Sequence, residues 1–134
     1  WNDQYNGAEK AYGANMEQFI DNVRTDLKSP GLPFVIGVMG QNGSKPAKGA
    51  MLTIQAAQLA METMPKFSSN VKAVRTDVLI DKAAEKLYPT WKQNIAEWEK
   101  TGSDHGYHYL GSAIWHLRMG DAFAKAMIDL LPSK

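Results

Sequence analysis

The chain has 134 residues, a length typical of one compact domain, and it contains no cysteine. The absence of cysteine excludes a thiolate nucleophile, a Cys-ligated zinc site and disulfide bonds. Lysine and arginine total 15 against 14 acidic residues, and these charges alternate along the chain, so we expect no nucleic-acid partner. No apolar run reaches the roughly 20 residues of a membrane-spanning helix, so we expect no membrane partner either.

The chain opens at Trp1 without an initiating methionine and enters an aromatic, Asn-rich stretch, WNDQYN, at residues 1–6. This opening indicates a piece of a longer protein. We therefore expect the true N-terminus, and any leader sequence, to lie upstream.

Residues 8–28 carry apolar side chains at steps of three and four, which predicts an amphipathic helix. Its apolar stripe consists of Tyr12, Met16, Phe19, Ile20, Val23 and Leu27. A Ser-Pro-Gly sequence at 29–31 ends the helix. Residues 33–39 form a continuous apolar run, typical of a strand buried on both faces of a parallel sheet, so helices are expected on both faces.

Residues 40–46 are polar and turn-forming, and they directly follow the carboxyl end of that strand, where sites are often built. A second helix is predicted over 50–63, before Pro65. Its apolar side consists of Leu52, Ala56, Leu59, Ala60 and Met64. A second strand is predicted within 70–80, with its centre at 71–76.

Residues 81–87 and 89–99 are predicted to be helical, with Pro89 at the first position of the second piece. A loop over 101–107 precedes a last helix that runs from 108 or 109 to 131. Its predicted stripe is Ala113, Leu117, Gly120, Ala124, Met127 and Leu131. This order of elements predicts a layered α/β fold. Since sheets average about five or six strands, we expect strands from an upstream segment to complete the sheet.

All three histidines, His105, His108 and His116, lie close together in sequence, with Asp104 beside the first. An imidazole held by a carboxylate is the usual general base for activating a hydroxyl, which makes Asp104 and His108 a candidate pair. The alternative is that Asp104 or Ser103 caps the last helix and the histidines are solvated. A metal site formed by Asp104, His105 and His108 is the weakest alternative, because the spacing matches no standard ligand set.

No serine lies in a Gly-x-Ser-x-Gly sequence. Ser44 comes nearest to a nucleophile, but a simple turn explains it better. The side-chain amide of Asn2 could donate to a developing oxyanion, or it could form an Asx turn before the first helix. Of the aromatic residues, Tyr107 and Tyr109 are the strongest candidates to face a sugar ring.

Three separated blocks resemble one family. They are WNDQYN at 1–6, LPFVIGV at 32–38 leading to Ala-Ala-Gln at 56–58, and DHGYHYLGS at 104–112 with GDAFA at 120–124. Together they resemble the sialate O-acetylesterase-type domain of the SGNH, or GDSL-like, hydrolases, in carbohydrate esterase family six. The resemblance implies a flavodoxin-like, three-layer α/β/α fold, with residues 1–134 as the C-terminal portion of one SGNH-type esterase domain.

The resemblance also implies an activity: removal of acetyl groups from a sugar or polysaccharide, without a cofactor, by a serine in an upstream Gly-Gln-Ser block. His108 matches the catalytic histidine and Asp104 is the best match to its acid. The wider group's Asp-x-x-His pattern would place the acid at position 105, where this chain has His105, so an upstream acid is the alternative. Asn2 matches the oxyanion-hole asparagine, and Gln58 would support substrate binding.

The resemblance suggests a secreted or extracytoplasmic protein, and these residues alone should be nearly inactive because the nucleophile lies elsewhere. The rival interpretation is a non-catalytic carbohydrate-binding or interaction module. In that case Tyr107 and Tyr109 would stack on a sugar while the histidines only form hydrogen bonds.

Overall fold

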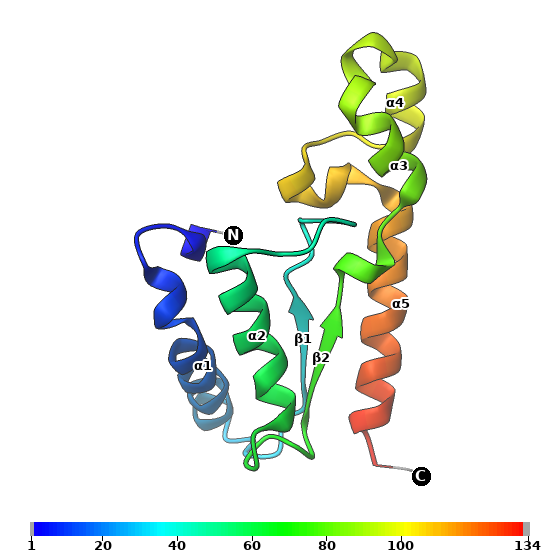
Figure 1. Cartoon of the computed structure of the whole chain (residues 1–134). Coiled ribbons are helices and arrows are strands. Elements are labelled where there is room, and N and C mark those ends of the chain that lie inside the picture. The colour runs from blue at the N-terminus through cyan, green and yellow to red at the C-terminus, as the bar shows by residue number, and fades with distance from the viewer. Residues whose placement is uncertain (1, 133–134) are drawn as a thin grey trace.

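The computed structural model of the chain describes residues 2–132, and Trp1, Ser133 and Lys134 lie outside this range. Short 3-10 helices (η) alternate with α-helices and two strands along the chain (Figure 1). In chain order the elements are η1 (Asn2–Gln4), η2 (Ala8–Lys10), α1 (Tyr12–Asp26), β1 (Phe34–Val38), α2 (Gly49–Thr63), β2 (Val71–Arg75), η3 (Asp77–Leu79), α3 (Lys82–Leu87), η4 (Tyr88–Gln93), α4 (Ile95–Thr101), η5 (Gly106–Gly111) and α5 (Ala113–Leu130).

The fold is mixed α/β, mostly helical, around two parallel strands. Phe34 pairs with Val71 at one end of the sheet and Val38 pairs with Arg75 at the other. Helices α1 and α2 lie on one side of the strands and α5 lies on the other (Figure 1). The predicted parallel pairing is confirmed, and both faces of the sheet carry helices as the apolar strand sequence requires. Completion of the sheet by further strands stays a prediction.

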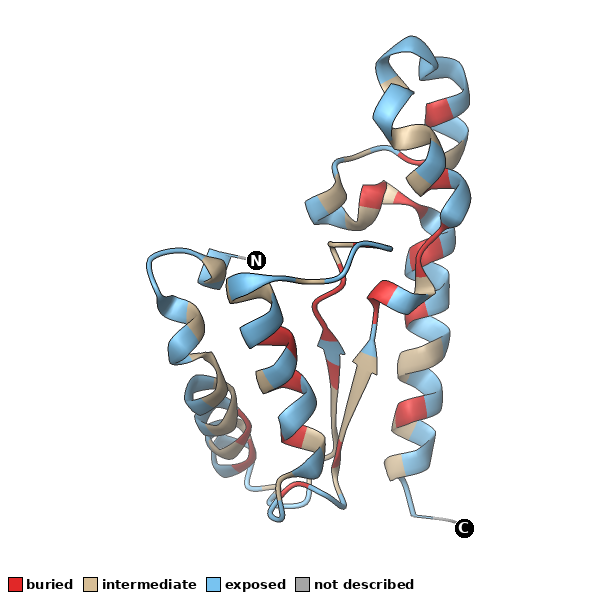
Figure 2. Cartoon of the chain, viewed as in Figure 1, coloured by how far each residue is buried: buried red, intermediate tan, exposed pale blue. Residues whose placement is uncertain are grey.

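Two clusters of buried apolar side chains form the core (Figure 2). The cluster between the sheet, α1 and α2 consists of Ile20, Ile36, Met61, Phe67 and Val71. The cluster beneath α3, α4 and η5 consists of Ile80, Ala84, Trp98, Leu110, Trp115 and Met119. Leu110 of the second cluster lies in η5, so this cluster holds the segment that carries His108 at the carboxyl ends of the strands.

The predicted apolar stripes of the helices are partly wrong. In α2 the buried side chains include Gln55 and Gln58, while Leu52 is 53% exposed. Hydropathy cannot identify this face, because its two amides are buried to hydrogen-bond the chain after β1. In α5 the buried residues are Trp115, Met119 and Ala126, and Leu117 is 71% exposed.

Trp115 sets the orientation of α5, because its indole N–H donates to the carbonyl of Thr76 at 2.8 Å. In α1 the buried residues are Ile20 and Arg24, whereas Phe19 and, just after the helix, Leu27 are mostly exposed. Arg24 is buried because its guanidinium donates to the Leu32 carbonyl at 2.8 Å, just before β1 begins.

Two predicted helix boundaries are also wrong. The helix predicted over 89–99 is divided into η4 and α4, with a non-helical backbone at Thr90. The last helix begins at Ala113, because Tyr109, Leu110 and Gly111 have φ angles of 54°, 60° and 58°. Left-handed backbone cannot continue a right-handed helix, so η5 is a separate element. Within residues 2–132, no helix combines the length and apolar character needed to cross a membrane.

Candidate active site

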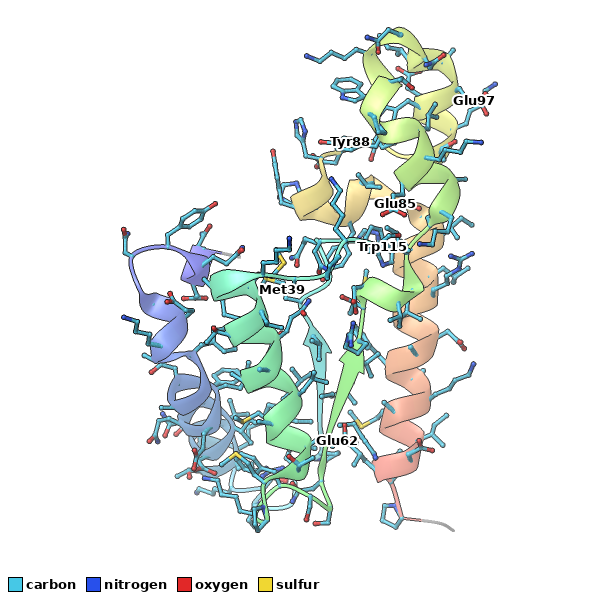
Figure 3. All side chains as sticks on the ribbon, in the orientation of Figure 1. Met39, Glu62, Glu85, Tyr88, Glu97 and Trp115 are labelled. Atoms are coloured by element: carbon cyan, nitrogen blue, oxygen red, sulfur yellow. The ribbon has the colours of Figure 1, made fainter. Side chains whose placement is uncertain are left out.

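The loop that follows β1, residues 39–45, is held by the two buried glutamines of α2. Gln58 Oε1 accepts a hydrogen bond from the Met39 amide at 2.8 Å, and its Nε2 donates to the Tyr12 hydroxyl at 2.9 Å. Gln55 Nε2 donates to the Met39 carbonyl and, at 3.1 Å, to Asn42 Oδ1. The loop therefore has a defined shape where the strand ends, which is where Figure 3 labels Met39.

The same loop is also bound to α3. Gly43 has a φ of 59°, and a Cβ there would lie 2.7 Å from Ile80 Cδ1 and 2.9 Å from Glu85 Oε1. The amide of Ser44 donates to Glu85 Oε1 at 2.8 Å, the Ser44 hydroxyl donates to the second Glu85 oxygen, and the Lys82 ammonium donates to the Ser44 hydroxyl. Burial raises the pKa of Glu85, but the Ser44 hydrogen bonds and the Lys82 charge outweigh it and leave the pKa below its ordinary value.

Tyr109 attaches η5 to the ends of both strands. Its hydroxyl lies 3.1 Å from Thr76 Oγ1 and accepts a hydrogen bond from the Gly40 amide at 3.4 Å. Thr76 Oγ1 in turn donates to the Val38 carbonyl at 2.7 Å. The Tyr109 ring packs edge-on against Trp115, with ring centroids 5.0 Å apart. These contacts hold a non-glycine residue in left-handed backbone, a conformation that costs free energy and persists only when the surroundings enforce it.

Backbone hydrogen bonds close residues 103–110 into a turn. The Leu110 carbonyl accepts from the amides of Ser103 at 2.9 Å and Asp104 at 3.2 Å. The His105 carbonyl accepts from the amides of His108 and Leu110, both at 3.0 Å. The turn brings the side chains at positions 104 and 108 to the same side.

Asp104 and His108, the candidate pair, are in direct contact. Asp104 Oδ2 lies 2.8 Å from His108 Nδ1, and Asp104 Oδ1 accepts from the His105 amide at 2.6 Å. The His105 amide first, and then the His108 side chain, hold the pKa of Asp104 below its ordinary value. An ionised carboxylate at Nδ1 favours the tautomer with hydrogen on Nδ1, which leaves Nε2 free to exchange a proton with a hydroxyl.

The neighbouring aromatic residues differ in what they contact. His105 Nδ1 lies 2.9 Å from the Tyr88 hydroxyl, and the Tyr107 ring stacks on His105 at 5.2 Å. Tyr107 is exposed, and its ring meets that of His108 edge-on at 4.5 Å. His116 lies on α5, with Nδ1 at 2.8 Å from the Ser112 carbonyl. Across residues 2–132, no three His, Asp or Glu side chains converge in a way that could hold a metal ion.

Asn2 lies in η1, which packs against α2, and it is exposed. Figure 1 shows η1 and η5 at the same end of the molecule, beyond the carboxyl ends of the strands. Among the residues that the structure describes, no hydrogen bond links Asn2 to His108. The structure thus joins Asp104 to His108, sets Tyr107 against His108, and keeps the polar groups of Tyr109 and Gln58 in contacts within the protein.

The sequence analysis did not identify Gln55, Thr76 and Tyr88, which hydrogen-bond to Met39, Tyr109 and His105 respectively. A signal for Gln55 existed, since it stands three positions before Gln58 on one helix face. Thr76 and Tyr88 gave no local signal, because their partners are 33 and 17 positions away in the chain.

Comparison with known families identifies the chain. A family model described as "Carbohydrate esterase, sialic acid-specific acetylesterase" matches residues 2–88. The chain belongs to this family. The matched residues 2–88 include Asn2, both strands and the two glutamines of α2, while the Asp104–His108 contact lies beyond the matched range. Searches of curated proteins and of solved structures returned no match.

Proposed function

We propose that this chain forms the C-terminal portion of an SGNH-type serine esterase domain that removes O-acetyl groups from carbohydrates. Membership of a carbohydrate esterase family supports ester hydrolysis as the general reaction. The observation that carries the proposal is the 2.8 Å contact between Asp104 Oδ2 and His108 Nδ1. The two parallel strands with helices on both sides support a flavodoxin-like fold of three α/β/α layers.

In the proposed reaction, His108 Nε2 takes the proton of a serine hydroxyl as that oxygen attacks the acetyl carbonyl. The ester bond breaks, the sugar oxygen leaves with the proton returned by His108, and an acetyl-serine remains. Water then attacks this acetyl group with His108 again as the base, which releases acetate and restores the serine. Asp104 stabilises the imidazolium in both steps, and the Asn2 amide donates to the oxyanion.

We propose that the nucleophilic serine belongs to a segment that precedes Trp1, as in the Gly-Gln-Ser block of the family that the sequence resembles. The hydroxyls of the nearest alternatives support this proposal. Those of Ser44, Ser103 and Ser112 bond to Glu85, the Gly111 carbonyl and Asp81 respectively. Within the described residues, none is hydrogen-bonded to His108.

Three further residues receive roles in this proposal. Tyr107 is exposed and contacts the His108 ring, so it would meet the substrate. Tyr109 and Gln58 position the site, because their polar groups bond to the ends of the strands rather than facing solvent. The substrate is an acetylated sugar or polysaccharide.

The test is hydrolysis of an acetylated methyl glycoside by the intact protein, including the segment proposed to precede Trp1, and by its His108→Ala variant. Loss of a general base lowers kcat/KM by roughly 10²–10⁴-fold. The control is Lys125→Ala, which removes an exposed ion pair with Asp121 and should stay within about threefold of the wild type. Wild-type hydrolysis by His108→Ala would exclude His108 as the base.

A non-catalytic sugar-binding function is the second candidate, favoured by the exposed ring of Tyr107 stacked on His105. In that case the protein would bind sugars and hydrolyse none of the acetylated glycosides. Tyr107→Ala would then abolish the binding.

A further inference from the structure

The two outer edges of the sheet can be told apart by the direction of their backbone groups. In a parallel pair, every second residue of a strand directs its N–H and C=O to the partner, and the residues between direct theirs away from it. The Phe34 amide donates to the Asn70 carbonyl at 3.0 Å, so the even-numbered residues of β1 face β2. The groups on the outer edge of β1 are therefore those of Val35 and Gly37.

The outer edge of β2 is covered by the chain itself. The Val71 amide donates to the Phe67 carbonyl at 2.9 Å, and the Ala73 amide donates to Glu62 Oε2 at 2.9 Å. The Lys72 ammonium first, and then the Ala73 amide, hold the pKa of Glu62 below its ordinary value, so a charged carboxylate lies against this edge. Covered amides and charged side chains discourage further pairing, which is the character of the last strand of a sheet.

The outer edge of β1 has no such cover. Among residues 2–132, no hydrogen bond is made by the backbone N–H or C=O of Val35 or Gly37, and the sheet contains two strands. Gly37 is exposed, although its neighbours Ile36 and Val38 are buried. The sequence of β1, FVIGV, contains no charged residue and no proline, which are the features that protect a free edge. This edge therefore has the character of one that pairs with another strand.

The position of α1 identifies which strand would pair there. Helix α1 lies beside α2 on one face of the sheet (Figure 1), and its Ile20 packs in one cluster with Ile36 of β1. Crossovers between parallel strands are right-handed, so helices on one face connect strands that follow one another in the same direction across the sheet. Because α2 connects β1 to β2, a strand that precedes α1 would lie on the other side of β1, at its free edge.

The path of the chain before α1 agrees with a parallel strand. Element η1 lies at the end of the molecule where β1 ends, and α1 returns the chain to the end where β1 begins (Figure 1). A strand that ends just before η1 would therefore run in the same direction as β1. Its carboxyl end would lie at the end of the molecule that carries η5 and the Asp104–His108 pair.

We propose that β1 is an inner strand of the sheet and that its free edge pairs with a parallel strand from the segment that precedes Trp1. The backbone groups of Val35 and Gly37 form the hydrogen bonds of this pairing, and β2 stays the last strand. The inference rests on the proposed function, in which the same segment supplies the serine, and it adds the surface on which that segment docks.

The first test is amide hydrogen exchange, followed by NMR, in the intact protein with the segment proposed to precede Trp1. Val35 and Gly37 should exchange roughly 100-fold or more slowly than Arg75, whose outward amide on β2 has no partner within residues 2–132. Ile36 is the control, because its amide faces β2 and should exchange slowly whether or not another strand is present.

The second test identifies the acceptors through NMR couplings across the hydrogen bonds. The amides of Val35 and Gly37 should each couple to a carbonyl outside residues 1–134. The acceptor of Gly37 should stand two positions after that of Val35, because residue numbers increase together in parallel strands. Three outcomes would overturn the proposal: both amides exchange as fast as Arg75, the acceptors lie within residues 1–134 as in pairing with a second copy, or the acceptors follow in the reverse order.

His108→Ala separates this inference from the function on which it rests. If hydrolysis requires His108 but Val35 and Gly37 exchange as fast as Arg75, the esterase assignment stands and the pairing of β1 is wrong. If both acceptors lie in the preceding segment while His108→Ala hydrolyses normally, the pairing stands and the esterase mechanism is wrong.

Discussion

Asp104 and His108 are in contact at 2.8 Å although their side chains are 42% and 62% exposed. Burial therefore does not hold the pair together. The backbone of the 103–110 turn does, because its carbonyls at 105 and 110 each accept two amides. The geometry of a solvent-exposed acid–histidine pair thus depends on a turn that Tyr109 fixes to the strands.

Asp104→Asn tests the role of the carboxylate. An amide at position 104 can present N–H to His108 Nδ1, which favours the wrong imidazole tautomer, so we expect kcat for an acetylated glycoside to fall by roughly 10²–10⁴-fold with KM nearly unchanged. Steady-state kinetics measure both constants. Asp121→Asn, which removes an exposed ion pair with Lys125, is the control and should retain activity. A loss of less than fivefold in Asp104→Asn would point to an acid from another segment.

The lowered pKa of Asp104 predicts a pH dependence of stability. The folded pKa lies below the unfolded value of about 3.9, so the contribution of Asp104 is fully present above that pH and is lost as the pH falls through the folded value. Urea unfolding should find Asp104→Asn less stable than the wild type at pH 7, with the difference shrinking towards pH 2. A difference that is constant from pH 7 to pH 2 would contradict this account.

Tyr109→Phe tests how η5 is attached to the sheet. The variant loses the hydroxyl contacts with Thr76 and Gly40, so we expect a decrease of about 1 kcal/mol in the free energy of unfolding. We also expect lower kcat, because the turn that carries Asp104 and His108 is less firmly placed. Tyr5→Phe, at an exposed tyrosine in the N-terminal segment, is the control. Equal stability of the two variants would show that the Tyr109 hydroxyl contributes nothing.

Gly43→Ala and Gly7→Ala separate backbone strain from steric overlap. Both glycines have positive φ, but a Cβ at Gly7 meets nothing within 4 Å whereas one at Gly43 overlaps Ile80 and Glu85. We expect a loss of about 1 kcal/mol for Gly7→Ala from backbone strain alone. Gly43→Ala should lose more than Gly7→Ala, by about 1 kcal/mol, because the added Cβ must also displace the side-chain ends of Ile80 and of Glu85, which is bonded to Ser44. Thermal or urea unfolding measures both, and equal losses would mean that the loop moves away from α3.

Sequence patterns predicted the strands and the Asp104–His108 pair for local reasons. A continuous apolar run marks a strand of a parallel sheet, and a four-residue separation lets two side chains meet across a turn. The helix faces were harder to predict, because Gln55 and Gln58 are buried by hydrogen bonds to Met39, which hydropathy does not record.

The left-handed residues Tyr109 and Leu110 had no local signal either, since such backbone favours glycine or asparagine. Their conformation follows from the contact between Tyr109 and Thr76, which are 33 positions apart in the chain. A cavity beside η5 was missed for the same reason, because its lining comes from four separated segments.

The most direct test of the central claim is to label the intact protein, including the segment proposed to precede Trp1, with a fluorophosphonate, which reacts with a serine activated by a histidine. Mass spectrometry then locates the label. We predict that the label lies on a serine outside residues 1–134 and that His108→Ala abolishes labelling. Ser44→Ala should label as the wild type does, because its hydroxyl is bonded to Glu85. Label on Ser44, or undiminished labelling of His108→Ala, would contradict the account.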